Sequence, residues 1–580
     1  PRGGCTKPCT GFAAASPPAG AGGSSRAPRR GLAAPRRAGA SGLRRGPFAR
    51  LGESAAAASL FLSNVHFHDQ GGYFAPAAET QPLLHSWSLA VEEQVYIVYP
   101  LLLAFLQRRW PGRLRLAIAL LAALSFAAAL ATLAYSSRSA FFLPHTRAWE
   151  LLLGATVALT PAPVWLAGRW REAAMGLGLL LIASALLCLG EDSGIPGFAA
   201  LWPTAGTALV LLAGAAGPSL VGRGLAWRPL VGLGLISYSL YLWHWPLLVL
   251  LRENQVGAAT PLQVGLALLL ALALAILTWA FVEQPFRRLV PRPRRAVAAG
   301  AAASLAVLAV GLAVSLGDGW PWRFDAARLR YAVLLEAETH YAAYDRGGCF
   351  LDSDQQAEDY DPVACLPGAE TPRERRLLIW GDSFAAHYFP GLRQSLGARG
   401  WAVSQYPATS CRPLRSGTDR RCDEVLAALP AILAWQGGFG TLLVAGHYQP
   451  LVLRLGEAEL LARLGESLAL AKATGARVLL VGQTPTFAFA IPRLLVIDRA
   501  ARARPEIRLP AERYQDLNAK LRALAAAAGV DFFDPAAAAC NEQGCLAALE
   551  GEPLLWDSGH FTAAGSAFYG AGIAERLAGP

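Results

Sequence analysis

Charged side chains are scarce in this chain. Only 16% of its 580 residues are Asp, Glu, Lys or Arg, whereas 54% are hydrophobic. A chain this poor in charge is too apolar for an ordinary soluble protein, and its length is sufficient for two or more domains. Composition alone therefore predicts a membrane protein with room for a further folded part.

Acidic residues are absent from the first fifty positions. Lys7 and nine arginines there contribute +10 of the net charge of +11, so the rest of the chain is nearly neutral. The location of the charge therefore argues against a nucleic-acid-binding protein, in which a folded basic surface would be expected.

The same fifty residues also lack a hydrophobic period, so we expect neither a packed core nor a signal peptide in them. Two interpretations stay open. The segment is either a basic, disordered arm, or an artefact of a mis-set start or a reading-frame error that replaces genuine sequence up to about Leu51. We favour the artefact because recognisable sequence begins abruptly after that point.

Long apolar runs dominate the first half of the chain, and several are long enough to cross a bilayer. The runs lie at 89–107, 116–135, 147–160, 173–190, 199–217, 233–251, 262–282 and 296–316. If each run crosses once, the arginine clusters at 108–115, 169–171, 223–228 and 287–295 fall on one side, which the positive-inside rule makes cytoplasmic. Residues 317–580 would then lie on the periplasmic side.

Six of the nine cysteines lie in the last part of the chain, spaced as three local pairs, Cys349 with Cys365, Cys411 with Cys422, and Cys540 with Cys545. Such a set suits an oxidising compartment. Six cysteines permit 15 connectivities, of which we prefer the sequential one. No CxxC pair or tight His/Cys cluster occurs in the sequence, so we expect no metal site. Cys188 lies in an apolar run and is expected to be a small core residue.

Ionisable and hydrogen-bonding side chains interrupt the apolar runs in four places. Groups of this kind at membrane depth are usually functional or paired, although each cluster alone could be an interfacial aromatic anchor or a structural ion pair. The occurrence of four clusters favours function. The candidates are His85, Glu92, Glu93, Gln94, Arg147, Glu150, Trp243, His244 and Glu283.

These segments resemble the membrane acyltransferase-3 family of bacterial saccharide O-acyltransferases. The resemblance rests on HSWSLAVEEQVYIVYP at 85–100, RAWELLLG at 147–154, SYSLYLWHWP at 237–246 and FVEQPFRR at 281–288, which occur in the family's order. It implies transfer of an acyl group from a cytoplasmic acyl-CoA, such as acetyl-CoA, across the membrane to a glycan. It also implies a first helix that carries an arginine and an active-site histidine, of which residues 1–50 show no counterpart.

The last third of the chain alternates short apolar strands with helical stretches. Strands are expected at 376–380, 401–406, 441–445, 476–482 and 530–533, with helices such as 457–474 and 511–528 between them. This alternation predicts a parallel-sheet, three-layer α/β domain.

Ser383 is the candidate nucleophile because it follows the first of these strands, where exposed amides at a helix start can hold an oxyanion. Gly381 permits the tight turn, and Asp382 is expected to fix the loop. Near the C-terminus, His560 would act as the base toward Ser383, with Asp557 holding its tautomer. Gly-Asp-Ser alone could equally be a helix N-cap, but its combination with Asp557 and His560 favours catalysis.

This half is similar to the SGNH hydrolases, whose first block matches Gly381-Asp382-Ser383 and whose last block matches Asp557 to His560. The family's oxyanion-hole Gly and Asn blocks are not evident. Thr409-Ser410-Cys411 and Ala445-Gly446-His447-Tyr448 stand at the corresponding strand ends, and the backbone of Gly446 is the better candidate donor. His447 is either a substrate contact or a structural histidine.

The two resemblances support each other, because bacterial fusions of this membrane domain to a periplasmic SGNH domain are familiar. We expect a multi-pass α-helical membrane domain at 51–316, a linker and disulfide-bearing segment at 317–375 and an SGNH-like α/β domain at 376–580. The protein would lie in the inner membrane of a bacterium.

The predicted function is O-acetylation of a cell-surface polysaccharide, such as lipopolysaccharide O-antigen or an exopolysaccharide. Acetyl-CoA would be the donor, no cofactor would be bound, and the glycan or a lipid-linked saccharide would be the acceptor. No nucleic-acid partner is expected. Two alternatives stay open, a membrane-anchored glycan O-acetyl esterase and a non-catalytic glycan-export or scaffold protein.

Overall fold

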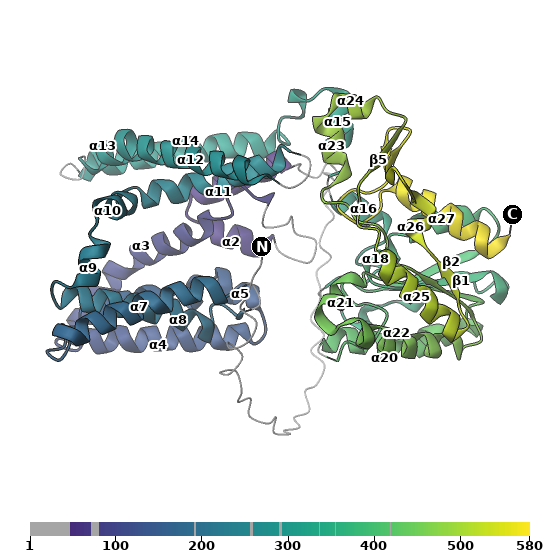
Figure 1. Cartoon of the computed structure of the whole chain (residues 1–580), viewed down its shortest axis with the longest axis horizontal. Helices are drawn as coiled ribbons and strands as arrows, with labels where there is room; N and C mark the ends of the chain where they lie inside the picture. Colours follow the sequence, from purple (N-terminus) through teal and green to yellow (C-terminus); the bar gives the residue numbers. More distant parts are fainter. Residues whose placement is uncertain are drawn as a thin grey trace, which may run out of the picture. The chain divides into compact units, whose positions relative to one another are not determined.

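The computed structural model describes residues 47–70, 80–190, 193–255, 259–288, 293–335, 337–353, 355–417 and 419–579. Residues 1–46, which hold most of the basic N-terminal segment, lie outside the described residues. The chain divides into two compact units (Figure 1), one helical and the other made mainly of residues 317–580 with two short segments from the helical part.

Within the described ranges, six helices of the first unit are long and apolar enough to cross a membrane, and a helix pair bent by 68° could form a seventh span. The six are α3 (Ser86–Arg109), α4 (Leu114–Leu133), α7 (Gly168–Cys188), α8 (Phe198–Ala215), α12 (Pro261–Thr278) with its continuation to Arg287, and α14 (Pro293–Leu316). The bent pair is α10 (Arg228–Leu235) and α11 (Ser237–Glu253). The predicted multi-pass helical domain is thereby confirmed.

One of the expected crossings is wrong. The apolar run at 147–160 forms α6 (Pro144–Ala158), whose 15 residues are fewer than the roughly 20 that a hydrocarbon core requires. Proline sets the start of this helix, and the sequence Pro161-Ala162-Pro163 follows its end. The predicted orientation assumed that each run crosses the membrane once, so the number of crossings on which it was based no longer holds. Shorter helices complete the unit: α1 (Pro47–Ser59), α2 (Ser63–Asp69), α5 (Ser137–Phe142), α9 (Leu220–Leu225), η4 (Trp279–Glu283) and α13 (Gln284–Arg287).

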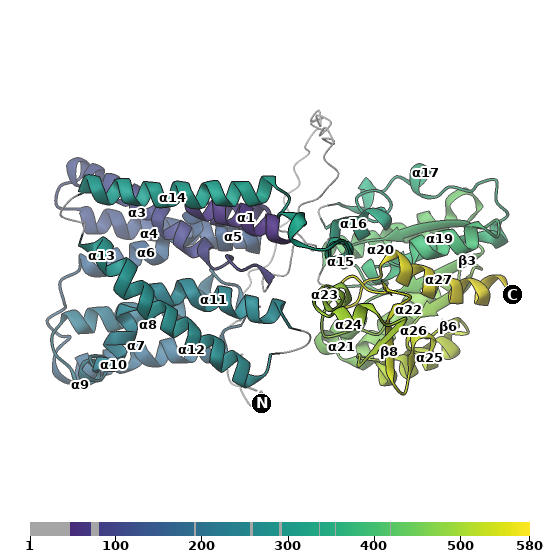
Figure 2. The same ribbon diagram turned by 90° about the horizontal axis from the view of Figure 1, so that it is seen from above.

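Glycines set the closest helix contacts of this unit. Helices α7 and α8 lie side by side (Figure 2). A Cβ on Gly178 would lie 2.6 Å from the carbonyl oxygen of Gly206, and a Cβ on Gly206 would lie 2.7 Å from that of Gly178. Small residues at such crossings let two backbones approach where apolar burial gives no driving force.

The second unit is built on a five-stranded parallel sheet in the order β2-β1-β3-β4-β6. Its strands are β1 (Arg376–Gly381), β2 (Ala402–Pro407), β3 (Thr441–Ala445), β4 (Arg477–Val481) and β6 (Asp531–Phe533). All five lie where the sequence predicted strands, so the parallel α/β fold is confirmed.

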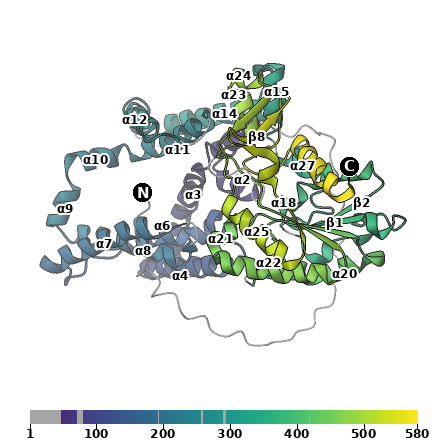
Figure 3. The ribbon, with the colours of Figure 1, turned by 45° about the vertical axis from the view of Figure 1, so that its right-hand side comes forward.

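Helices cover both faces of this sheet (Figure 3). Leu377 and Ile379 of β1 pack into the core with α19 (Phe389–Gly397) and α27 (Ala563–Ala578). The alternate residues Leu378 and Trp380 pack into the opposite core. Burial on both faces explains why these strands are continuous apolar runs rather than alternating ones. The opposite core includes side chains of α20 (Arg420–Ala434), α22 (Glu457–Lys472) and α25 (Gln515–Ala528).

A second, antiparallel sheet was not foreseen from the sequence. It has the order β5-β8-β7, with β9 paired to β8. Its strands are short and hold few of the β-branched and aromatic residues that mark a strand. The strands are β5 (Glu506–Leu509), β7 (Cys540–Asn541), β8 (Gly544–Leu549) and β9 (Glu552–Pro553). Because β9 leads directly into the Asp557 loop, this sheet helps to place one half of the candidate site.

The segment between the last candidate span and β1 packs onto the same core. Tyr344, Phe350 and Leu351 are buried, and Leu351 forms a β-bridge with Ala408 just beyond β2. Its helices are η5 (Pro321–Arg323), α15 (Ala326–Val333), α16 (Ala337–Ala343), η6 (Ala357–Asp359), α17 (Pro362–Cys365) and η7 (Arg373–Arg375). The remaining helices of the unit are α18 (Ser383–Ala386), η8 (Trp435–Gly437), α21 (Gln449–Leu455), α23 (Ile491–Ile497), α24 (Arg499–Arg502) and α26 (Pro535–Ala539).

We predict that Gly391→Ala destabilises the outer unit by roughly 3 kcal/mol or more, because a methyl group cannot be inserted into so tight a contact. A Cβ at Gly391 would lie 1.8 Å from the carbonyl oxygen of Ser566, where α19 crosses α27. Pulse proteolysis of the full-length protein in detergent, scored on fragments of the outer unit, measures the change.

Gly397→Ala on the same helix is the matched control, because nothing lies within 4 Å of a Cβ at that position. This control is expected to be neutral or slightly stabilising, since Ala favours helix over Gly. Equal effects of the two substitutions would contradict the prediction.

Candidate active site

Ser383 begins α18 directly after β1, and the local backbone depends on the glycine before the turn. Gly381 has φ +152°, and a Cβ there would lie 1.8 Å from the carbonyl oxygen of Ala445 on the neighbouring strand. No side chain fits at this position, as the sequence suggested. The strand therefore delivers Ser383 to the carboxyl edge of the sheet, where it is fully buried.

Three side chains form a continuous hydrogen-bonded chain. Ser383 Oγ lies 2.9 Å from His560 Nε2, and His560 Nδ1 lies 2.7 Å from Asp557 Oδ2. With the Nδ1 proton directed to the carboxylate, Nε2 is free to accept the hydroxyl proton. The structure thus brings together the nucleophile, base and orienter predicted from sequence.

The spacing of Asp557 and His560 follows from a small closed loop. Asp557 Oδ1 accepts hydrogen bonds from the amides of Gly559 at 2.8 Å and His560 at 2.6 Å. A β-bridge between Leu555 and Phe561 closes the loop behind them. One carboxylate therefore shapes the backbone with one oxygen and orients the imidazole with the other.

Asp557 is ionised throughout the neutral range. Burial by itself raises the pKa of this carboxyl, but the charge and hydrogen bond of His560 and the two amides outweigh burial and bring its pKa below the usual value. A carboxylate in this state keeps the imidazole in one tautomer and stabilises the imidazolium that forms when Ser383 is deprotonated.

Asp382 fixes the turn, as expected, and also joins it to the next strand end. Its Oδ1 accepts from the amide of Phe384 at 2.9 Å, and its Oδ2 accepts from the amide of His447 at 3.0 Å. Arg412 Nε lies 3.4 Å from the same Oδ2. The loop after β1 and the loop after β3 are therefore held together by one buried carboxylate.

Aromatic rings surround the triad. His447 stacks on Phe384 with ring centroids 4.2 Å apart, and Trp556 stacks on His560 at 5.7 Å. Burial lowers the pKa of His447 to about 4, so this imidazole is neutral at physiological pH. The sequence left His447 as a substrate contact or a structural residue, and here it forms part of the wall beside Ser383.

Gly446 follows the last residue of β3, which pairs with Gly381 in the sheet register. A Cβ at Gly446 would lie 2.9 Å from Cδ of Pro413, so a glycine suits this close contact. Its role as an oxyanion donor, and that of the Ser383 amide, stay predictions.

All three disulfides pair sequentially, as preferred from the spacing: Cys349–Cys365, Cys411–Cys422 and Cys540–Cys545. Cys188 is partly buried and lies outside these disulfides. The second disulfide holds the loop after β2, which also carries Arg412. In the described parts of the chain, no group of three or more His, Cys, Asp or Glu side chains is arranged to hold a metal.

Sequence reasoning missed several side chains of this site. His387 lies under the triad, fully buried, with its ring stacked on Phe561 at 3.7 Å and its pKa lowered well below the usual value by burial. His340 stacks on Trp556 at 5.3 Å. No local motif marks these histidines, but His387 falls four residues after Ser383, one helical turn along, which is a signal that could have been used.

In the helical unit, the structure brings His85 and His244 together. Their ring centroids lie 5.9 Å apart. Tyr241, one turn before His244, donates to the carbonyl oxygen of His85 at 2.7 Å and lies 2.8 Å from Ser88 Oγ. Trp243 donates to Thr278 Oγ1 at 2.9 Å. Two of the sequence motifs therefore meet at one polar cluster.

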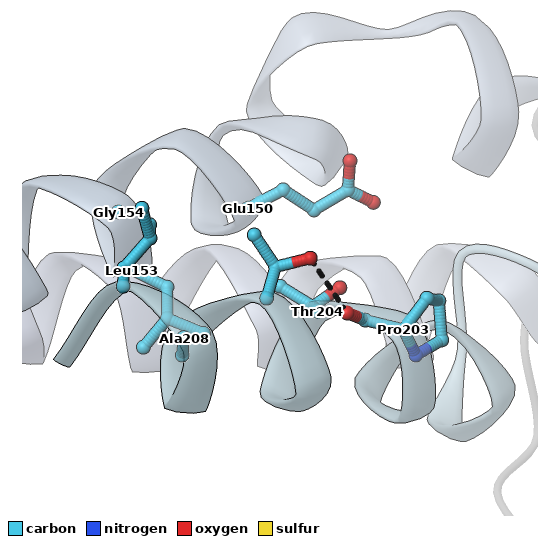
Figure 4. A pocket seen from close by; sticks show the side chains of 8 residues that line it. Glu150, Leu153, Gly154, Pro203, Thr204 and Ala208 are labelled. Atoms are coloured by element: carbon cyan, nitrogen blue, oxygen red, sulfur yellow. Dashed lines mark hydrogen bonds between the residues drawn. The ribbon is translucent and has the colours of Figure 1, made fainter. Parts of the chain in front are cut away.

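Arg147 and Glu150 form an ion pair of 3.1 Å, with the guanidinium 5.4 Å from the ring of Trp87. Glu150 also lines a pocket between α6 and α8 (Figure 4), together with Thr204 and Pro203. The pocket volume of about 200 Å³ is below the roughly 300 Å³ at which small-molecule sites begin, so it has room for a small group only.

The remaining candidates are distributed over other contacts. Glu283 accepts from Arg287 at 2.6 Å and from Ser239 at 3.2 Å. Gln94 donates to the carbonyl oxygen of Phe61 at 2.7 Å and to Asn64 at 2.9 Å. Glu92 and Glu93 form no hydrogen bond or ion pair with other described residues. Asn64, Ser88, Tyr241 and Thr278 were not singled out from the sequence, because hydroxyls and amides in apolar helices are commonly bonded to their own backbone.

Comparison with known proteins agrees with this division. The family described as an acyltransferase domain matches residues 50–280, and the family described as an SGNH domain fused to AT3 domains matches residues 348–575. The chain is 30% identical over 258 residues to the O-acetyltransferase OatA of Staphylococcus aureus (strain NCTC 8325 / PS 47). That match covers 40% of this chain and 41% of OatA, so the chain spans well under half of the length of the curated relative.

A solved structure is also similar, the periplasmic domain of the lipopolysaccharide acetyltransferase of Salmonella ser. Paratyphi A. It covers 42% of this chain and 97% of that chain, with 16% identity and a TM-score of 0.36.

Asp557→Asn is predicted to lower turnover of acetyl esters by roughly 10³- to 10⁴-fold, because an amide at this position supports the wrong imidazole tautomer. Hydrolysis of a small acetyl ester by the full-length protein measures the loss. Asp361→Asn is the matched control, since Asp361 also caps two amides but orients no imidazole. An Asp557→Asn variant as active as this control would remove the triad from the chemistry.

His447→Gln is predicted to leave the shape of the pH–rate profile unchanged over roughly pH 5 to 8. A histidine whose pKa is lowered to about 4 stays neutral until the pH falls through that value, so its protonation contributes nothing in this range. The profile of acetyl-ester hydrolysis, recorded for both proteins, tests this. A displaced acid limb in the variant would show that His447 titrates during turnover.

Proposed function

We propose that the chain is a membrane-bound O-acyltransferase of a cell-surface polysaccharide. The premise is that it joins an acyltransferase domain to an SGNH domain of the type fused to AT3 domains. The observation that carries the proposal is the hydrogen-bonded chain from Ser383 through His560 to Asp557, on the same polypeptide as a multi-pass helical domain. The relative OatA, an O-acetyltransferase, supports an acetyl group as the cargo.

In the first half-reaction, His560 takes the proton of Ser383 as Oγ attacks the carbonyl carbon of the incoming acyl donor. The tetrahedral intermediate collapses, its leaving group receives the proton from His560, and an acyl-serine remains. In the second half-reaction, His560 deprotonates a glycan hydroxyl, which attacks the acyl-serine. Ser383 recovers its proton, and the product is an ester of the glycan.

Burial of the site favours transfer over hydrolysis. Ser383 is fully buried, and the rings of Phe384, His447 and Trp556 lie around the triad. An acyl-serine protected from water persists until an acceptor hydroxyl reaches it. This supports a transferase more than an esterase, for which water is the acceptor.

The helical unit supplies the acyl group in this proposal. Acetyl-CoA on the cytoplasmic side is the donor, and the polar cluster of His85, Tyr241 and His244 is the candidate route for the group through the helices. Paired polar groups inside an apolar bundle are costly, which makes a functional role for this cluster plausible on physical grounds. The outer unit would face the periplasm of a bacterial inner membrane, where its disulfides are stable.

The test is the O-acetyl content of the cell-surface glycan, measured by NMR in cells that carry Ser383→Ala in place of the native chain. We expect acetylation to fall to the level of a deletion strain, because no acyl-serine can form. Ser395→Ala is the matched control, since its hydroxyl donates to the carbonyl oxygen of Gly391 within its own helix, away from the triad.

The same measurement separates the rival functions. If the chain were a glycan esterase, Ser383→Ala would raise the O-acetyl content instead. If it were an export or scaffold protein, the amount or length of the polymer would change and the acetylation per residue would not. Either result contradicts the transferase.

A further inference from the structure

An arginine-lined pocket of about 610 Å³ lies in the outer unit, and no residue of the triad lines it. Its walls come from α15 and α24. The charged lining consists of Arg328, Arg330, Arg499, Arg502 and the single acid Asp325.

The two walls are fixed against each other. Helix α15 packs on α23, and α24 follows α23 after one residue. Tyr331 of α15 is buried, and its hydroxyl donates to the carbonyl oxygen of Gly551 at 3.0 Å. Arg502 donates to the carbonyl oxygens of Leu495 at 2.8 Å and Val496 at 3.1 Å. The helices that carry the arginines are therefore held by packing, and Arg502 is also fixed by hydrogen bonds.

The positive charge of the pocket is only partly compensated. Arg328 lies 3.5 Å from Asp325, and Arg330 pairs with Glu552. Arg499 and Arg502 have no carboxylate partner among the residues that the structure describes. Two uncompensated guanidinium groups facing one pocket match a phosphate group, which accepts their paired N–H donors.

The segment that leads into α15 has the composition of a membrane interface. The last candidate span ends at Leu316 and α15 begins at Ala326. Between them stand Trp320, Trp322 and Phe324, and the side chain of Trp322 is 78% exposed. Tryptophan beside arginine is typical of chain segments that lie at the level of lipid headgroups.

We propose that this pocket binds the phosphate of an anionic membrane lipid and thereby docks the outer unit on the bilayer surface, with Trp322 in the headgroup layer. Arg499 and Arg502 contact the phosphate, and Arg328 and Arg330 flank it. The proposal concerns binding only, so it stands or falls separately from the transferase function.

The experiment is hydrogen exchange of the full-length protein in nanodiscs of phosphatidylcholine, with or without phosphatidylglycerol, followed in peptides that cover 320–333 and 495–504. Protection is expected to rise with phosphatidylglycerol. In the Arg499→Ala/Arg502→Ala variant, the protection in phosphatidylglycerol discs is expected to fall by roughly 30-fold. This is the effect of removing two arginines from an anionic surface.

Arg399→Ala/Arg420→Ala is the matched control in the same unit. Arg399 binds the carbonyl oxygen of Gly579, and Arg420 is 91% exposed and pairs with Glu424. Arg499→Gln alone guards against a folding defect, because the side chain of Arg499 is exposed. It is expected to lower protection by roughly 5-fold.

Three results would overturn the proposal. Equal protection in neutral and anionic discs would exclude lipid phosphate as the ligand. Unchanged protection in both arginine variants would exclude the pocket as its site. Protection by soluble glycerol phosphate in neutral discs would assign the pocket to a phosphorylated solute.

Discussion

The hydrogen bond between Ser383 and His560 is the constraint that the fold of the outer unit must meet, because it joins residues 177 positions apart in the chain. The serine and the histidine are positioned by separate structural elements. A strand end with an obligatory glycine places the serine, and a bridged loop behind the second sheet places the histidine. Two sheets and the helices between them must therefore fold correctly before a bond of 2.9 Å can form.

Two carboxylates hold the surroundings of that bond. Asp382 is buried and Asp557 is partly exposed, and an unsatisfied charge at either position would be costly. Each accepts two backbone amides, which offset that cost. Asp557 shapes its own loop, whereas Asp382 joins the loops after β1 and β3. The nearby imidazoles of His387 and His447 are kept neutral by burial and act as ring surfaces. The imidazole of His560, bonded to Ser383 and Asp557, is therefore flanked by rigid, neutral rings.

In the helical unit, polar side chains likewise need protein partners. Its polar side chains are paired, His85 with His244 of another helix and Arg147 with Glu150 one turn along α6, since hydrocarbon cannot satisfy them. Elsewhere in the unit, the glycine pair Gly178 and Gly206 allows the close contact between α7 and α8. The proposed transfer of an acyl group from the helical unit to the outer unit needs polar side chains held in fixed positions in each unit.

The sequence by itself determined the two-part organisation, the five parallel strands and the candidate triad, and it favoured the three sequential disulfide pairs. All of these depend on local patterns: apolar runs, short cysteine spacings, Gly-Asp-Ser after a strand, and an aspartate three residues before a histidine. Local patterns did not reveal the antiparallel sheet, the failure of α6 to reach spanning length, or the positions of Arg412 and His387. These depend on contacts between distant segments, such as the amide of His447 on Asp382, and only the tertiary structure decides them because such contacts leave no periodicity in the chain.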